Sequence, residues 1–140
     1  MVDLLDYTIA QYRYDGLYPP EDDFLHLVEL LQQHQQLVFA TPVYWYAMSG
    51  LMKVFFDRLT DIVTIQKRVG RKMKGKQTFL LAVGAEETLP LGFEEPFRLT
   101  SAYFDMEFKA SLYCKTSEIY VKGTTTEAFL RNLTDATTKS

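Results

Sequence analysis

The chain reads Leu-Val-Phe-Ala at residues 37–40 and continues Thr-Pro-Val-Tyr-Trp-Tyr-Ala-Met-Ser-Gly over residues 41–50. The first four residues form a short apolar run, which is typical of a strand buried on both faces of a parallel sheet. Apolar side chains recur at helical spacing after Gly50. Residues 41–50 therefore form a strand-to-helix loop, and such loops lie at the carboxyl end of parallel sheets, where α/β proteins bind ligands.

Two segments at this end of the sheet are candidates for ligand contact. Tyr44, Trp45 and Tyr46 would suit a flat ligand rich in π electrons; the alternative is that they pack in the core or against another subunit. The strand predicted at 77–83 ends at Gly84, where the missing side chain lets backbone approach a ligand closely. An ordinary turn after that strand is the alternative.

Strand and helix patterns alternate along the whole chain. Strands are predicted at residues 2–7, 37–40, 77–83 and 112–121. Helices are predicted from Phe24 after acidic residues 21–23, at 49–65, at about 94–105, and after a capping box at 124–127. Such alternation implies parallel pairing with right-handed crossovers. The expected fold class is α/β, with a doubly wound parallel sheet in a single domain.

The helix predicted at 49–65 carries more apolar surface than one sheet face usually needs. Its first stripe is Leu51, Phe55, Leu59 and Ile62, and a second stripe beside it is Met52, Phe56 and Val63. We interpret the second stripe as a subunit contact. A deeply buried helix explains the same pattern.

Length and composition exclude several classes of protein. At 140 residues the chain is one domain, and its net charge of −3 argues against a nucleic-acid partner. No apolar run approaches the roughly 18 residues needed to span a bilayer, and no signal peptide opens the sequence. The single Cys114 cannot form an internal disulfide. These features favour a cytoplasmic protein without a membrane partner.

The aromatic loop and the helix after it carry a family resemblance. Residues 42–46, followed by Ser49-Gly50 and by Lys53 with Asp57-Arg58, resemble the flavodoxin-like NAD(P)H-dependent FMN reductase and quinone reductase superfamily. Asp22-Asp23, Gly75-Lys76 and the strand ending at residues 83–87 fit the same resemblance, which extends from Val2 to about Tyr113. It implies that FMN contacts Pro42, Val43, Tyr44, Trp45, Tyr46, Gly84, Ala85, Glu86 and Glu87.

The resemblance also implies the rest of the biochemistry. The family fold is a flavodoxin-like sheet in the order 2-1-3-4-5, with FMN at the carboxyl ends of the strands. NAD(P)H is the electron donor, a quinone or similar small molecule is the acceptor, and the protein is commonly a homodimer. The implied function is therefore that of an FMN-dependent NAD(P)H oxidoreductase.

One departure from the family pattern concerns the start of the sequence. Residues 2–7 match the second family strand, so the first strand, the phosphate-binding loop and the first helix have no counterpart in the sequence. Because that loop and helix would hold the FMN phosphate, we expect an N-terminally incomplete sheet of about four strands and weak FMN binding. The gap would close if the neighbouring strands met, if another chain supplied a strand, or if the sequence belongs to a longer protein.

Two other functions make different demands on the sequence. A non-catalytic, truncated family member acting as a dimeric interaction module is favoured by the missing phosphate loop. A receiver-type signalling domain needs a phosphorylatable aspartate at the end of its third strand, and here that strand ends Ala40-Thr41-Pro42.

The remaining polar residues do not indicate a catalytic or metal-binding role. Lys53 and Asp57 are four residues apart and can pair on a helix surface, and the basic residues between 67 and 76 suit a solvated connector. His26, His34 and Cys114 lack neighbours at metal-ligand spacing, so no metal site is expected.

Overall fold

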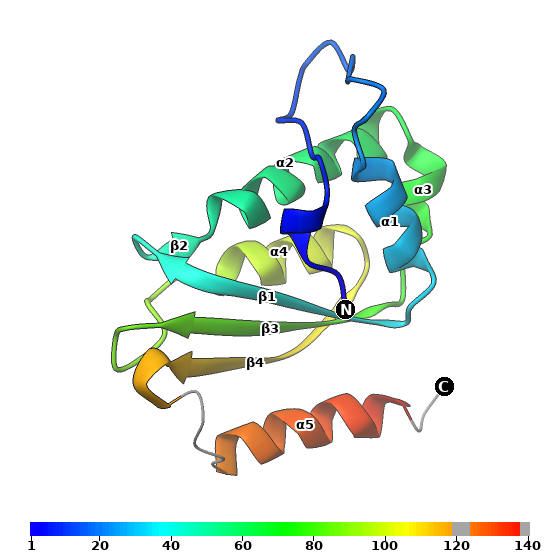
Figure 1. The fold of residues 1–140 in the computed structure, drawn as a ribbon. Helices are drawn as coiled ribbons and strands as arrows, with labels where there is room; N and C mark the ends of the chain where they lie inside the picture. Colours follow the sequence, from blue (N-terminus) through cyan, green and yellow to red (C-terminus); the bar gives the residue numbers. More distant parts are fainter. Residues whose placement is uncertain (119–123, 138–140) are drawn as a thin grey trace.

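The computed structural model describes residues 1–118 and 124–137, which form an α/β fold (Figure 1). The elements in chain order are the 3-10 helix η1 (Leu4–Asp6), α1 (Phe24–Gln32), β1 (Gln36–Tyr44), β2 (Ala47–Met48), α2 (Gly50–Thr64), α3 (Lys67–Arg71), β3 (Gln77–Gly84), α4 (Glu95–Tyr103), β4 (Glu107–Lys115), the 3-10 helix η2 (Thr116–Glu118) and α5 (Thr124–Thr137). The sheet order is β2-β1-β3-β4. β1, β3 and β4 are parallel, whereas β2 is antiparallel to β1. The predicted α/β, flavodoxin-like class is confirmed.

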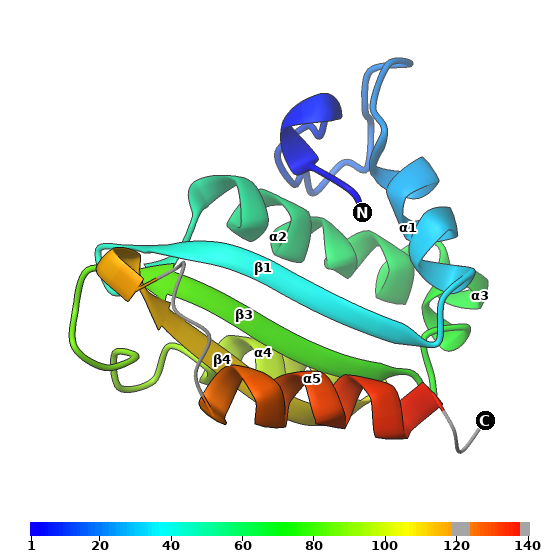
Figure 2. The ribbon, with the colours of Figure 1, turned by 60° about the horizontal axis from the view of Figure 1, so that its bottom comes forward.

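Helices cover the two faces of the sheet unequally. α2 and α4 lie on one face and α5 lies on the other (Figures 1 and 2). Successive β3 residues point to opposite faces, so Leu80 packs in the large core cluster while Phe79 packs with Phe129 of α5. β3 is therefore buried on both faces, as its apolar sequence predicts. The same expectation is wrong for β1, where Val38 is 44% exposed because the structure places no helix over that side of the strand.

The N-terminal segment differs from its predicted structure. Residues 2–7 contain η1 (Leu4–Asp6) instead of a strand, because the Asp3 carboxylate accepts a hydrogen bond from the Leu5 amide at 3.0 Å and caps the 3-10 turn. The fourth strand of the sheet is instead β2, which follows β1 directly. The last strand, β4, begins at Glu107 and so precedes the predicted segment 112–121 by five residues. Residues 119–121 of that prediction lie outside the described residues.

The predicted helices are present, and the wide apolar surface of α2 packs largely against the core. Met52 belongs to the buried core, and the ring of Phe56 lies 5.3 Å from that of Phe39 and 5.1 Å from that of Phe97, between centroids. Met52 and the Phe56 ring therefore pack against the domain core, which favours the interpretation of a buried helix. α5 begins at Thr124, as the capping box predicts, although the threonine side chains of that box lie outside the described side chains.

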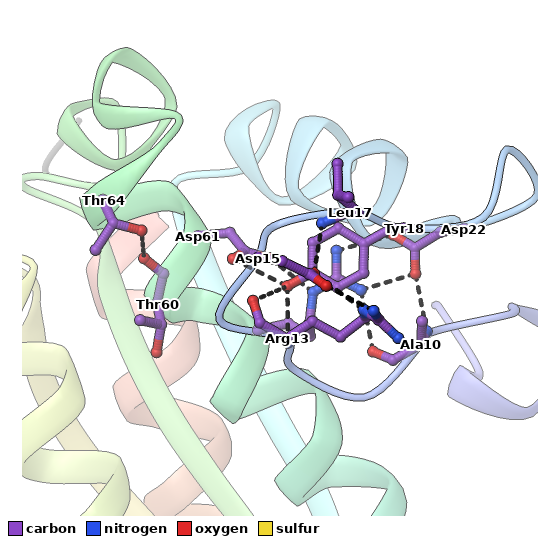
Figure 3. Close-up of polar contacts among 10 residues, drawn as sticks. Ala10, Arg13, Asp15, Leu17, Tyr18, Asp22, Thr60, Asp61 and Thr64 are labelled. Carbon is purple, nitrogen blue, oxygen red and sulfur yellow. Dashed lines mark hydrogen bonds and ion pairs between the residues drawn. The ribbon is translucent and has the colours of Figure 1, made fainter.

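The long connection between η1 and α1 is fixed to α2 by a buried arginine. Arg58 is only 1% exposed, and its Nη1 and Nη2 donate to the two carboxylate oxygens of Asp22 at 2.7 and 2.9 Å. Its Nε donates to Asp61 Oδ2 at 2.7 Å, and its Nη1 donates to the Ala10 carbonyl at 3.0 Å. Figure 3 shows Tyr18, Asp22 and Asp61 gathered at this point, with the Tyr18 hydroxyl donating to Asp61 at 3.1 Å. Each guanidinium nitrogen thus donates at least one hydrogen bond and the charge has two carboxylate partners, so its burial is tolerated.

The basic connector is only partly solvated. α3 is a short helix, but Lys76 is buried, and its Nζ donates to the carbonyls of Gln32 and His34 at 3.0 and 2.6 Å. The lysine therefore satisfies two carbonyls at the end of α1, where the helix dipole also favours a cation. Burial lowers the pKa of Lys76. The interpretation of this segment as a solvated connector is wrong for Lys76.

Candidate functional site

β1 ends in a tight hairpin at the carboxyl end of the sheet. Val43 pairs with Met48 and Tyr44 pairs with Ala47, so Trp45 and Tyr46 form a two-residue turn. Both turn residues have positive φ, 49° and 67°, as in the type I′ turns that usually carry Asn-Gly. A bulky residue in this conformation costs about 1–2 kcal/mol, and retained backbone strain of this kind clusters at functional sites.

The hairpin presents its aromatic rings to solvent. Trp45 is 93% exposed, and Tyr44 and Tyr46 are also exposed. They are therefore not core residues within this domain, and contact with a ligand and contact with another subunit are the interpretations that stay open. Backbone strain and exposed aromatic rings thus coincide at this end of the sheet.

Side-chain oxygens fix the hairpin to α2. The Ser49 amide donates to Thr41 Oγ1 at 3.0 Å, and the Met52 amide donates to Ser49 Oγ at 3.2 Å. The second contact is an N-cap, in which a serine oxygen satisfies a free amide of the first helical turn. The hairpin and the helix start therefore form one connected unit.

Gly84, at the end of β3, lies beside the hairpin strand. A Cβ added to Gly84 would lie 2.8 Å from the Tyr113 hydroxyl and 3.2 Å from the Val43 Cβ. Only glycine allows this close approach without a shift of its neighbours. The structure thus brings the two predicted segments, residues 42–46 and 84–87, together at one end of the sheet.

β4 supports the loop after Gly84. The Tyr113 hydroxyl donates to the Glu86 carbonyl at 2.8 Å, and Thr116 Oγ1 donates to the Gly84 carbonyl at 2.8 Å. Lys115 forms an ion pair with Glu87. Burial raises the pKa of Tyr113, so its phenol remains a neutral donor at physiological pH. Ala85, Glu86 and Glu87 are exposed above these supports.

Sequence reasoning missed the supporting residues Tyr113, Lys115 and Thr116. These residues lie at or just after the carboxyl end of β4. Because parallel strands end at the same side of a sheet, the predicted topology was sufficient to place them near the other strand ends. Lys53 and Asp57 form the expected exposed pair at 2.5 Å on α2. The part of the chain that the structure describes contains no His, Cys, Asp and Glu cluster able to hold a metal ion, and no helix there could cross a membrane.

The sequence profile of the NADPH-dependent FMN reductase family matches residues 1–106. The chain belongs to this family. A similar curated protein is the putative NAD(P)H-dependent FMN-containing oxidoreductase YwqN of Bacillus subtilis, with 34% identity over 102 residues, covering 67% of this chain and 54% of the relative. The chain spans about half the length of the curated relatives it matches.

Two solved structures illustrate the likeness of the family fold. The Trp repressor binding protein from Bacillus subtilis has 29% identity and a TM-score of 0.61, over 66% of this chain and 62% of that chain. The FMN-dependent NADH-azoreductase from Bacillus anthracis, solved with FMN, has a TM-score of 0.59 over 96% of this chain and 75% of that chain. Its 8% identity supports the fold alone.

Proposed function

We propose that this chain forms the flavin-ring side of an FMN-dependent NAD(P)H oxidoreductase that passes electrons to a quinone or a similar small acceptor. Family membership supports the cofactor and the donor class. The observation that carries the proposal for this chain is the close approach of Val43 to Gly84, where a Cβ added to the glycine would lie 3.2 Å from the Val43 Cβ. The strained aromatic hairpin therefore lies beside the loop that follows Gly84. These are the two segments that the family resemblance assigns to flavin.

The residues at this end of the sheet suit the flavin ring system. Tyr44, Trp45 and Tyr46 would offer aromatic faces, and the backbone amides of the hairpin and of residues 84–87 would offer hydrogen-bond donors. Tyr113 and Thr116 would hold the second loop in position through the carbonyls of Glu86 and Gly84. FMN, when bound, supplies the acceptance of hydride from NAD(P)H and the transfer of its electrons. The chain would orient the ring and limit the access of water.

The described residues suit the FMN phosphate less well than they suit the flavin ring. Among residues 1–118 and 124–137, no strand precedes α1, and the segment before it contains only η1 and a long loop. That part of the chain therefore offers no second strand-to-helix loop beside the hairpin. Each neutral hydrogen bond to the ring contributes about 0.5–1.5 kcal/mol, whereas nanomolar binding requires about 12 kcal/mol. We accordingly expect this 140-residue chain to bind FMN weakly.

Titration with FMN and with riboflavin tests this proposal. Riboflavin carries the same ring without the phosphate, so the two dissociation constants should agree within a factor of about three if only the ring is held. Trp45→Ala should weaken both ligands and restore part of the quenched flavin fluorescence. Tyr103→Ala, which removes an exposed aromatic ring from α4, is the matched control and should change neither.

Three outcomes would contradict parts of the proposal. Tight FMN that copurifies with the chain would show that its phosphate is held after all. Failure of both ligands to bind at high concentration would favour the alternative of a non-catalytic interaction module. Binding that Trp45→Ala leaves unchanged would move the flavin away from the hairpin. NAD(P)H oxidation with added FMN and a quinone should exceed the rate of free FMN alone.

We also propose a homodimer in which the exposed hairpin contacts a second copy. The strained turn and its solvent-facing rings support this surface. Light scattering at micromolar concentration should give twice the monomer mass, and Trp45→Ala should shift the equilibrium toward monomer. A monomer under all conditions would contradict the dimer without affecting the flavin proposal.

A further inference from the structure

The hairpin at the end of β1 is held by very little backbone pairing. β2 contains only two residues, and the register pairs Tyr44 with Ala47 and Val43 with Met48. In a two-residue hairpin the residues that flank the turn form a hydrogen-bonded pair, and an antiparallel ladder then alternates between hydrogen-bonded and non-hydrogen-bonded pairs. The pair of Val43 and Met48 is therefore of the second kind, and the ladder supplies direct backbone hydrogen bonds only beside the turn.

The next hydrogen-bonded position of this ladder joins Pro42 to Ser49, and it cannot form in the usual way. Proline has no backbone N–H to donate. The Ser49 carbonyl is already used, because it accepts the Lys53 amide at 2.9 Å as α2 begins. The Ser49 amide and the Pro42 carbonyl remain, and the structure joins these two groups through a side chain.

The Thr41 hydroxyl occupies this position. Its oxygen accepts a hydrogen bond from the Ser49 amide at 3.0 Å, and it donates one to the Pro42 carbonyl at 3.1 Å. The hydroxyl thus lies between the two backbone groups that a longer ladder would join directly. Because Thr41 is only 4% exposed, loss of the hydroxyl would leave both backbone groups without this partner, beside a buried apolar side chain.

The turn that this contact closes is strained. Trp45 and Tyr46 have φ values of 49° and 67°, a conformation that bulky residues keep only where the surrounding structure holds them. Their rings are exposed, so packing against this domain does not hold the turn. The backbone ladder is short as well. The Thr41 hydroxyl is therefore a main restraint on the conformation of the turn.

We propose that Thr41 is a positioning residue of the flavin site, whose hydroxyl closes the hairpin and holds Trp45 and Tyr46 in their strained conformation. It acts through the backbone of the hairpin and not by contact with the ligand. Without the hydroxyl, a ligand would have to order the turn on binding, and its affinity would fall. The identity of the ligand rests on the proposed function, whereas the closure of the hairpin rests on the contacts of this chain alone.

The sequence contains a reporter for the hairpin, because Trp45 is its only tryptophan. Thr41→Val keeps the shape of the side chain but removes the hydroxyl. We expect the fluorescence anisotropy decay of Trp45 to gain a fast component, and hydrogen exchange at the Ser49 amide to become at least about tenfold faster. Thr41→Ser keeps the hydroxyl and should return both measurements toward the native values.

A matched control separates positioning from an ordinary loss of stability. Thr78 is also buried, and its hydroxyl forms a hydrogen bond with Ser101 Oγ at 2.7 Å. It lies at the amino end of β3, away from the hairpin. Thr78→Val should therefore lower the free energy of unfolding but leave the Trp45 anisotropy and the Ser49 exchange unchanged. Equal changes of these two measurements in Thr41→Val and Thr78→Val would overturn the proposal.

Titration with riboflavin connects the hairpin to the ligand. We expect Thr41→Val to raise the riboflavin dissociation constant about three- to tenfold, and Thr78→Val to leave it unchanged. A mobile hairpin with unchanged riboflavin affinity would overturn the positioning role. Failure of the native chain to bind riboflavin would overturn the proposed function and the role toward flavin with it. The Trp45 and Ser49 measurements would then confirm or contradict the closure of the hairpin on their own.

Discussion

The guanidinium carbon of Arg58 lies 3.4 Å from the centre of the Tyr18 ring. The same tyrosine donates its hydroxyl to Asp61, which also accepts from Arg58 Nε. The aromatic face and the two carboxylates of Asp22 and Asp61 together surround one buried cation. This contact connects a loop that precedes α1 to a helix that begins at the candidate flavin site.

Removal of the Arg58 charge should therefore destabilise the domain strongly. Arg58→Met keeps most of the side-chain volume but leaves the buried carboxylates of Asp22 and Asp61 without their cation, and we expect a loss of about 3–5 kcal/mol. Urea denaturation followed by circular dichroism measures this difference. Lys53→Ala, which breaks the exposed pair with Asp57 on the same helix, should cost less than about 0.5 kcal/mol. Similar costs for the two variants would contradict the structural role of Arg58.

The same cluster predicts a specific dependence of stability on pH. Burial favours a raised pKa for Asp22, but hydrogen bonds from Arg58 and from the Ala10 amide outweigh it, and the pKa lies below its usual value. The carboxylate therefore stabilises the fold fully above the unfolded-state pKa of about 3.9 and loses this contribution as the pH falls through the folded-state pKa. Asp22→Asn should flatten the fall in unfolding free energy below about pH 4.

Substitution of the two turn residues of the hairpin should raise the stability of the domain and lower its affinity for flavin. Trp45→Asn with Tyr46→Gly supplies the residues that a type I′ turn prefers, and we expect a gain of about 1–2 kcal/mol in the free energy of unfolding. The same double substitution removes two exposed rings from the proposed flavin surface, so riboflavin affinity should fall. Thermal unfolding and flavin titration on one sample measure both effects. A loss of stability would show that the rings make contacts that offset the strain.

Gly84 should tolerate no side chain. Gly84→Ala places a Cβ within 2.8 Å of the Tyr113 hydroxyl, and we expect a cost of about 1–3 kcal/mol from overpacking. Tyr113→Phe removes that oxygen, so the cost of Gly84→Ala should be smaller in the Tyr113→Phe background. A double-mutant cycle measures the coupling. Additive costs would mean that the remaining close neighbours, Val43 Cβ and the Tyr113 ring carbon Cε2, are the obstacle.

Local patterns were sufficient to predict much of the fold. The apolar repeat of α2 and the apolar run of β3 matched both periodicity and length, and burial in the structure follows them. The strand prediction for residues 2–7 is wrong because the Asp3 carboxylate accepts a hydrogen bond from the Leu5 amide, which favours a turn over a strand. The sequence analysis did not predict β2, because Trp45-Tyr46 lacks the asparagine and glycine that are typical of a two-residue hairpin turn.

The candidate site was predictable only in part. The two loops followed from strand ends and from the family resemblance, but their contact through Val43 and Gly84 depends on the parallel register of β1 and β3. The Tyr113 and Thr116 contacts with residues 84–86 join positions about thirty apart in sequence. No local pattern encodes such contacts.

The unequal cover of the sheet has a consequence for how the domain opens. α5 contacts the rest of the molecule through a small cluster centred on Phe79, Leu112 and Phe129, while the other helices share one large core. Local opening free energies follow the number of buried apolar contacts that must break. α5 should therefore detach as a separate cooperative unit, at a lower free energy than global unfolding, and leave the β1–β3 pair and its hairpin intact. Hydrogen exchange would then show two levels of amide protection, a lower one in α5 and a higher one in the β1–β3 pair. A thermal melting curve would show a single transition.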